Sequence, residues 1–512
     1  MKKLFLFVRM LALAGVAWGV CIERLAADEA AKPWVVVNED CSTTIAKMAE
    51  DELCEAGLRR HFTERLKGPR LTHYAVNPQA MCACYDSKVA TPIWKERKVS
   101  DKSEPKPMPK WIARLKAFHK QGVDPYRIWM ACAREHGVKA WISMRMNDVH
   151  CVEEHDRWMC SELWFARPDL RREPSGNIRK WHGDSDGPFD YAKQEAFDFH
   201  LAYLQELVDR YGDVADGIEC DWIRFPHHLP FGHEREHAVV LTAFMRKVRA
   251  IADARAQRNG RPFVVAVRVA SSVDASQGLG TDAIAWAREG LVDVVTPCNF
   301  FNVINFNASW SDWKRLLGEA NAKVVLLAGM DDGIERRGLW KRESVNAEEA
   351  AGYFARAFEE GVTDGVNLFN YFLATKDTPV YRLIAFDGLD ASRVNGMTRR
   401  FAYTWCDTFA DDTDPHRPFP AALDTRRTFR FDLPSAQPGD RVIVHMRRHC
   451  DAAPCAFPLA HALMNGTRPL KVLGPEDVEF PRTAVRRGAN DFSVGPAKGL
   501  AVNGLEVEFS VR

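Results

Sequence analysis

The chain has 512 residues, of which 46% are hydrophobic and 27% are charged, and its formal net charge is +1. This length allows two or three domains with their own cores. The balanced charge lacks the cationic surplus that attracts nucleic acids or anionic membranes, so we exclude both as principal partners.

The N-terminus has the pattern of a secretory signal peptide. Two lysines precede a mostly apolar run over 4–20, and small residues offer cleavage after Gly19 or Ala27. We predict residues 1–27 as the signal peptide and export to the periplasm or the outside. Val20 stands where a lipobox has a small residue before Cys21, so we do not expect a lipid anchor. No later run reaches the ~18 apolar residues of a membrane span.

After the signal peptide, short apolar runs alternate with helical patterns. The expected strands cover 34–37, 71–76, 138–144, a strand starting at Gly217, 263–269, 292–297, 324–327 and 365–371. The expected helices cover 45–66, 111–119, 126–136, 194–210, 238–256, 281–290 and 347–360. Eight strands alternating with helices predict an α/β fold, a (β/α)8 TIM barrel over residues 30–392. A doubly wound sheet is the runner-up, but no Gly-rich phosphate turn follows the first strand.

The pattern changes in residues 393–512. Strands are expected at 429–433, 441–446, 492–494 and 505–511, with turns at 463–466 and 502–504. We predict an all-β sandwich domain. An accessory domain packed on the barrel is the expected role, and carbohydrate binding is the alternative.

The fourth strand of the barrel carries the most informative residues. Its alternation places Gly217, Glu219 and Asp221 on one face. A buried carboxylate without a partner is costly, so this face is expected to look into the barrel interior, with Asp221 at the mouth. Arg145 ends the third strand and Arg268 lies in the fifth, so two guanidinium groups are expected to flank the carboxylates and favour their charged forms.

An ionised Asp221 suits a nucleophile, or a carboxylate that stabilises an oxocarbenium-like transition state. Glycosidic cleavage also needs an acid, and Asp148 and Asp331 at the ends of strands three and seven are the candidates. Glu219 lies one layer deeper and is better placed to orient other groups. The alternative is that these charges form an ion-pair network that only shapes the interior.

Further side chains near the strand ends are candidates for substrate binding. Sugar rings stack on exposed aromatic side chains. Trp222 faces the helices, so we expect it in the core and not in contact with a sugar. The predicted substrate-binding residues are Arg145, Asn147, His150, Trp164, Arg224, Arg268, Asn299 and Asn370.

No metal or cofactor is expected. His150, Glu153, Glu154 and His155 lie close together in the sequence but lack the helical register of a His-Glu-x-x-His site. No cysteine spacing fits zinc. In an oxidising compartment Cys450 and Cys455 are the easiest pair to join, and Cys132 and Cys220 are expected as buried thiols.

The segment 216–226, Asp-Gly-Ile-Glu-Cys-Asp-Trp-Ile-Arg-Phe-Pro, resembles the fourth strand of bacterial glycosyl-hydrolase-like proteins with a family-10-like TIM barrel. The resemblance extends over 34–390, including the segments 145–150, 163–171, 189–192 and 290–293. It implies a barrel that acts on polysaccharide outside the cytoplasm. Asp221 matches the acidic position of the family pattern, and Arg224 matches its arginine.

The same strand is similar to the family 18 chitinase sequence Asp-Gly-hydrophobic-Asp-hydrophobic-Asp-Trp-Glu. Glu219 replaces the first inner aspartate, Asp221 matches the second, and Ile223 stands at the position of the catalytic glutamate. Because isoleucine cannot protonate a leaving group, a non-catalytic sugar-binding barrel is a real alternative.

We therefore predict an exported glycoside hydrolase that acts on a poly- or oligosaccharide by carboxylate chemistry at the barrel mouth. The alternative is a carbohydrate-binding protein with a vestigial site. A deacetylase or lyase on this scaffold would need a metal site or a base that the sequence does not reveal. The sequence does not indicate the oligomeric state.

Overall fold

The structure is a computed structural model. It describes residues 33–40, 42–66, 70–97, 107–152, 154–173, 187–299, 304–331, 333–335, 342–359, 362–369, 382–383, 394–404, 419, 421–448 and 457–511. The signal peptide, Glu153, Asn370, Cys450 and Cys455 lie outside these residues, as does the domain boundary expected after residue 392. The predictions that rest on them therefore remain predictions.

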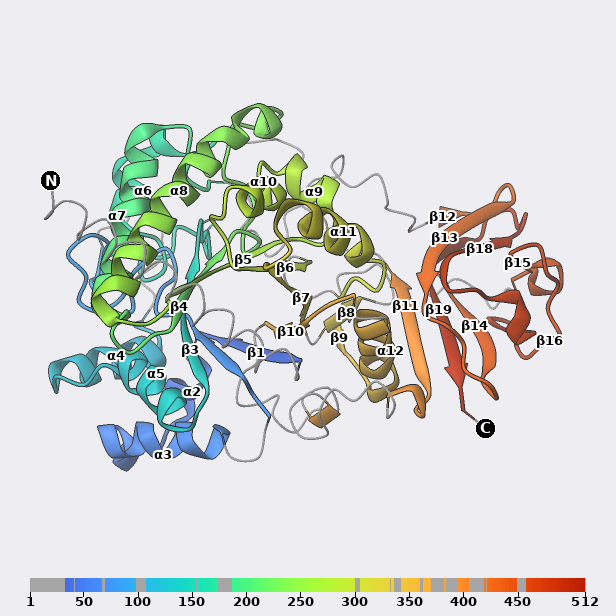
Figure 1. Ribbon diagram of the computed structural model, residues 1–512, viewed down its shortest axis with the longest axis horizontal. Helices are drawn as coiled ribbons and strands as arrows, with labels where there is room; N and C mark the ends of the chain where they lie inside the picture. Colours follow the sequence, from blue (N-terminus) through green and yellow to red (C-terminus); the bar gives the residue numbers. More distant parts are fainter. Residues whose placement is uncertain are drawn as a thin grey trace, which may run out of the picture. The chain divides into compact units, whose positions relative to one another are not determined.

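Eight parallel strands form a closed barrel (Figure 1). In chain order they are β1 (Trp34–Glu39), β2 (His73–Val76), β3 (Lys139–Arg145), β4 (Gly217–Asp221), β5 (Val264–Ala270), β6 (Val294–Cys298), β7 (Val325–Met330) and β10 (Gly365–Leu368). Each strand pairs in parallel with the next, and β10 neighbours β1 to close the cylinder. The predicted (β/α)8 fold is confirmed.

Helices connect the barrel strands. They are α2 (Ser42–Lys47), α3 (Glu55–Leu66), α4 (Lys110–Lys120), α5 (Pro125–Glu135), α6 (Glu162–Ala166), α7 (Gln194–Tyr211), α8 (Glu234–Asn259), α9 (Val273–Gly278), α10 (Ala283–Arg288), α11 (Trp310–Asn321) and α12 (Ala347–Phe358). The single helix expected over 45–66 is wrong. The acidic residues Glu50–Glu52 form a short 3-10 helix instead, and the Glu52 carboxylate accepts hydrogen bonds from Arg60 and His61 of α3.

Side chains alternate along the barrel strands between the helical layer and the interior. Ile218 and Cys220 of β4 face outward and belong to the main hydrophobic core. Trp222 follows them and contacts the rings of Tyr191, His228, Phe244 and Trp286, which confirms its expected place in the core. Because the outward positions of β4 are apolar, its polar residues Glu219 and Asp221 are left for the interior.

Antiparallel sheets follow the barrel. The larger has the order β11 (Arg399–Thr404), β19 (Ala501–Ser510), β14 (Arg441–Arg448), β17 (Asp477–Phe480), β16 (Lys471–Val472), with β12 (Ala421–Ala422) also paired to β19. The smaller has the order β13 (Arg427–Leu433), β18 (Gly488–Val494), β15 (Leu463–Met464). Phe480 of the larger sheet meets Phe492 of the smaller edge to face, with ring centroids 6.1 Å apart. This arrangement is consistent with the predicted sandwich.

The turn predicted at 502–504 is wrong. These residues lie inside β19, where the pairing with β14 skips Asn503 between Arg447 and Arg448. An Asn-Gly pair therefore accommodates a β-bulge here rather than a hairpin. The turn predicted at 463–466 is present, since Asn465 and Gly466 both have positive φ angles. A remaining pair, β8 (Gly333–Glu335) and β9 (Arg342–Ser344), forms a separate antiparallel ribbon.

Within the described residues, no helix is both long enough and apolar enough to cross a bilayer. Cys132 and Cys220 are buried and unpaired, as expected.

Candidate active site

Asp221 ends β4 inside the barrel and is fully buried. One carboxylate oxygen lies 2.5 Å from Nη1 of Arg268 on the neighbouring strand β5. The other accepts the backbone N–H groups of Ile223 and Arg224, at 3.2 and 3.0 Å. Both oxygens of this carboxylate are therefore occupied by positive or dipolar donors, which hold it in one orientation.

Arg268 is the partner that the sequence predicted for this carboxylate. Burial lowers the pKa of its guanidinium, but the Asp221 charge raises it further, so that the pKa lies above the ordinary value. Nη2 donates to Sγ of Cys298 at 3.2 Å, and the guanidinium lies 3.6 Å from the centroid of the Phe369 ring. Arg268 is thus fixed on three sides by an ion pair, a thiol and an aromatic face.

Glu219 lies two residues earlier in β4, deeper in the barrel. One of its oxygens accepts hydrogen bonds from Asn38 and Ser143, and the other accepts one from Asn367, each at 2.9 Å. Burial raises the pKa of this carboxyl above its ordinary value, although Arg268, Asn367 and Ser143 oppose the shift. Glu219 lies one layer deeper than Asp221, as expected, and its orienting role stays a prediction.

A second network starts at the end of β3. Arg145 does not donate to Asp221, its neighbour across the strands. Its guanidinium donates instead to Asp40 at 3.0 Å and to Asp148 at 3.3 Å. The sequence analysis missed Asp40, although this residue stands two positions after Asn38 and therefore on the same face of the first strand.

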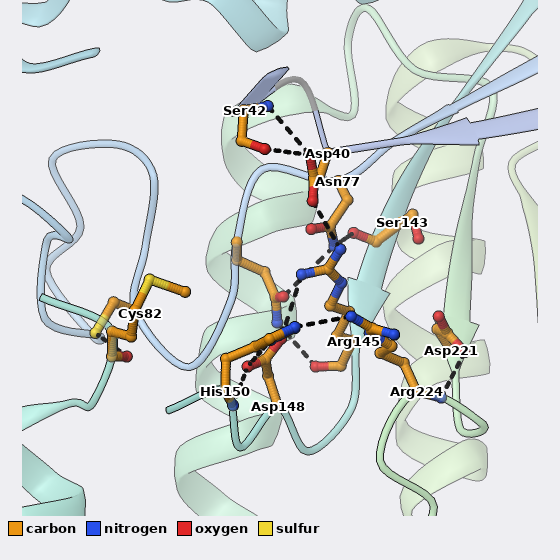
Figure 2. Close-up of polar contacts among 12 residues, drawn as sticks. Asp40, Ser42, Asn77, Cys82, Ser143, Arg145, Asp148, His150, Asp221 and Arg224 are labelled. Atoms are coloured by element: carbon orange, nitrogen blue, oxygen red, sulfur yellow. Dashed lines mark hydrogen bonds and ion pairs between the residues drawn. The ribbon is translucent and has the colours of Figure 1, made fainter. Parts of the chain in front are cut away.

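The network continues from Asp148 through His150 to Arg224 (Figure 2). Nδ1 of His150 lies 2.8 and 2.9 Å from the two oxygens of Asp148, and its backbone N–H also donates to this carboxylate. Nε2 of the same ring lies 2.7 Å from Nη2 of Arg224. These contacts form a continuous network of charged and polar side chains.

These contacts and burial shift the pKa values of the network residues in different directions. Burial raises the pKa of Asp148, but His150 and Arg145 together hold it well below its ordinary value. Burial lowers the pKa of His150, and that of Arg224 falls to about 9 because it is buried and lies near Arg145. The charged form of Asp148 is therefore favoured, which does not suit a general acid.

The backbone at Phe225 is unusual. Its φ is +58°, in the left-handed region that bulky residues rarely adopt, and it lies between Arg224 and Pro226. The ring of Phe225 packs edge to face against His150, with centroids 4.7 Å apart. Strain of this kind persists where surrounding contacts enforce it, and it is common at functional sites.

Two other predicted residues have defined surroundings. The Asn147 amide is buried and bonds to the backbone of Phe189 and His227, so it joins two loops. Trp164 is buried, donates to the carbonyl of Gly187 and lies under Arg171. Neither Asn147 nor Trp164 presents a surface to a ligand.

Asn299 and Asp331 follow β6 and β7, and both are buried. Among the described residues, Nδ2 of Asn299 has no hydrogen-bond partner. The charge of Asp331 raises the pKa of Arg224.

Three interior residues that the sequence analysis did not single out are Asn38, Ser143 and Asn367, the donors to Glu219. The signal was available, because each is a polar residue at an inward position of a barrel strand. In the part of the chain that the structure describes, no three His, Cys, Asp or Glu side chains form a group suited to a metal.

Neither a protein family nor a curated protein matches the chain. Solved structures do match. A GH36 α-galactosidase from Geobacillus stearothermophilus in complex with raffinose shares 9% identity over 94% of this chain, with a TM-score of 0.35, and the chain spans 56% of its length.

Two further matches are shorter. A GH5 xyloglucan-specific β-1,4-glucanase from a ruminal metagenomic library shares 11% identity, with 69% of this chain and 87% of that chain covered and a TM-score of 0.38. A GH18 N-acetylglucosaminidase from Paenibacillus barengoltzii shares 11% identity, with 59% and 69% covered and a TM-score of 0.29. The likeness is to glycoside hydrolase barrels of several families and not to family 10 in particular.

Proposed function

We propose that the protein is an exported glycoside hydrolase that acts on a poly- or oligosaccharide at the C-terminal end of its barrel. The observation that carries the proposal is the convergence of Asp40, Arg145, Asp148, Asp221 and Arg224 at or just beyond the C-terminal ends of β1, β3 and β4. Barrel enzymes place their chemistry at this end. The resemblance of the fourth strand to glycosyl-hydrolase-like proteins supports the same substrate class.

In this proposal Asp221 stabilises positive charge and does not attack the sugar. A nucleophile needs an oxygen that can reach the anomeric carbon. Both oxygens of Asp221 are bound and the residue is fully buried. Its ion pair with Arg268 instead fixes the field at the mouth, where an oxocarbenium-like transition state develops. Asp331 is the acid, since Asp148 is held in its charged form by His150 and Arg145.

The alternative is a carbohydrate-binding protein on a vestigial hydrolase barrel. The burial of Asp221 favours it, because this carboxylate is the acidic residue of the fourth-strand pattern and is engaged with Arg268. In that case the polar groups at the barrel mouth bind sugar hydroxyls without turnover.

Hydrolysis of a panel of polysaccharides, followed by mass spectrometry of the products, tests the proposal. We expect the wild-type protein to cleave at least one glycan and Asp331→Asn to lose at least 100-fold in kcat, as for loss of a general acid. Asp274→Asn, an exposed site paired with Arg235, should behave as wild type. Binding by the wild type and both variants without cleavage by any of them would establish the alternative.

A further inference from the structure

His150 is the most exposed member of the charged network, followed by Asp40. The side chain of His150 is 23% exposed, whereas that of Asp148 is 1% exposed. Phe225 packs against the edge of the ring, so the imidazole is held in place while part of it remains open to the outside. A group that exchanges protons with a substrate needs this combination of a fixed position and access.

The contacts determine which nitrogen of His150 carries the proton. Arginine has N–H donors and no acceptor, so the contact of 2.7 Å with Arg224 requires Nε2 to accept. The proton of a neutral ring then lies on Nδ1, which donates to Asp148. The ring is therefore a neutral imidazole with a basic Nε2, oriented by a carboxylate behind it.

We propose that His150 is the catalytic base of the site, that Asp148 positions it, and that Arg224 keeps Nε2 unprotonated until substrate enters. This inference rests on the proposed function and names the base that sequence reasoning did not find. The arrangement of a carboxylate, an imidazole and a reacting proton is the one by which hydrolases activate a weak nucleophile.

Nε2 takes a proton from water, and the water oxygen bonds to the anomeric carbon. The glycosidic C–O bond breaks, and its electron pair passes to the leaving oxygen, which takes a proton from the carboxylic acid of Asp331. Return of the proton from the imidazolium to Asp331 restores both groups. Arg224, displaced from Nε2 by the water, is then available to donate to a sugar hydroxyl.

Among the described residues, the charged groups that act on the His150 ring are Asp148, Arg224 and Arg145. Burial and the two arginines lower the pKa of His150, and Asp148 raises it. Since a base acts only when unprotonated, activity is lost as the pH falls through this pKa. Removing Asp148 should therefore move the acidic limb of the pH profile to lower pH, and removing Arg224 should move it to higher pH.

The tautomer is tested by 15N NMR of the full chain labelled at histidine, with the His150→Gln spectrum for assignment. We expect Nδ1 protonated and Nε2 unprotonated at pH 7, with a midpoint below the ordinary value of about 6.5. A doubly protonated ring at pH 7, or a proton on Nε2, would overturn the inference. This measurement needs no substrate, so it stands apart from the proposed hydrolysis.

The catalytic role is tested by pH profiles of kcat/KM for wild type, His150→Gln, Asp148→Asn and Arg224→Gln. We expect His150→Gln to lose at least 100-fold in kcat, and the other two to shift the acidic limb in opposite directions. His233→Gln removes an exposed histidine that also pairs with a carboxylate, Glu236, and should match wild type. Thermal melting shows whether the variants are folded. If His150 had only a structural role, the acidic limb of the pH profile would stay in place in folded Asp148→Asn and Arg224→Gln.

Different results would contradict the hydrolase function and the role of His150 as its base. If no glycan is cleaved while the tautomer is as described, the hydrolase function is wrong and the geometry of the dyad stands. If glycans are cleaved and His150→Gln retains the wild-type kcat, the hydrolase function stands and His150 is not its base.

Discussion

Within the part of the chain that the structure describes, only one of the two polar groups of the Asn367 side-chain amide forms a hydrogen bond in the barrel interior. Nδ2 donates to Glu219, while Oδ1 has no hydrogen-bond partner among the described residues. Rotation of this amide by half a turn would offer Glu219 an acceptor in place of a donor. The contact between these two residues can therefore serve a charged carboxylate or a group that itself donates.

This freedom predicts different outcomes for two substitutions at Glu219. Glu219→Gln should change the free energy of unfolding by less than about 1 kcal/mol, since Asn367 can turn to accept from the new amide. Glu219→Leu should cost about 3 kcal/mol or more, because it leaves the buried donors of Asn38, Ser143 and Asn367 unmet. Urea unfolding at pH 7 measures both. Equal losses for the two variants would show that Asn367 cannot turn.

The lowered pKa of Asp148 predicts a pH-dependent contribution to stability. Its ionised form is favoured in the fold, so it stabilises the protein above the unfolded pKa of about 3.9, and this contribution is lost as the pH falls towards the folded value. The difference in unfolding free energy between wild type and Asp148→Asn should therefore become smaller as the pH falls from 5 to 3. Unfolding curves at each pH measure it. Asp274→Asn, whose carboxylate is exposed, should show no comparable narrowing.

Residue patterns predicted the orientation of side chains better than their partners. Alternation along the fourth strand placed Glu219 and Asp221 in the interior, where they lie. It gave no information on which donor each would meet, because partners such as Asn367 stand 148 residues away in the sequence. His150 and Asp148 are two residues apart, but their contact depends on a loop conformation that hydrophobic periodicity does not encode.

At the scale of elements, α12 is buried along most of its length. Residues Glu349 to Ala357 are all buried. The hydroxyl of Tyr353 donates to the carbonyl of Gly329 in β7, and Gly352 lies directly against the backbone of Arg400 in β11. A helix buried all round sits between two layers, and here those layers are the barrel wall and the C-terminal sheet.

Gly352→Ala tests this packing. A Cβ at position 352 would overlap the carbonyl oxygen of Arg400, so either the helix or the strand must move. We expect a loss of about 1–3 kcal/mol in unfolding free energy, the usual cost of overpacking. Gly318→Ala is the matched control, because a Cβ there meets nothing within 4 Å. Thermal unfolding of both variants measures the difference, and equal melting temperatures would contradict the packing.

Local sequence patterns predicted the strands but not every turn. Strands were recognised because β-branched and apolar runs are bounded by turn residues. The Asn-Gly pair at 503 and 504 carries the same local signal as a hairpin, yet it forms a bulge inside β19. Local chemistry allows both conformations, and only the pairing with β14 decides between them.

For the whole molecule, the closed barrel followed from the count and spacing of strands, and the C-terminal sheets from the loss of helical periodicity. Strand β11 was missed, since it lies directly beyond the region where the strand rhythm changes and is rich in arginine. Its arginines are accommodated by Asp440 and Glu508, which are distant in the sequence. Long-range ion pairs of this kind overrule the expectation that charged runs are exposed.

The contacts of α12 predict the behaviour of a shortened protein. A chain that ends at residue 393 would expose the face of α12 that packs on β11, including the region around Gly352. We expect this barrel fragment to aggregate or to unfold at a lower temperature than the full chain. Size-exclusion chromatography and thermal melting measure the outcome. A monodisperse fragment with the melting temperature of the full chain would show that the barrel does not depend on the C-terminal sheets.

Four positions in the barrel interior meet at a single carboxyl group: Asn38, Ser143, Glu219 and Asn367. Loss of the acid in a descendant sequence would strand three donors, and loss of any donor would weaken the reason to retain the acid. Selection should therefore act on these four residues as a group. Across divergent homologues these four sites are expected to co-vary, changing together to apolar residues or persisting together.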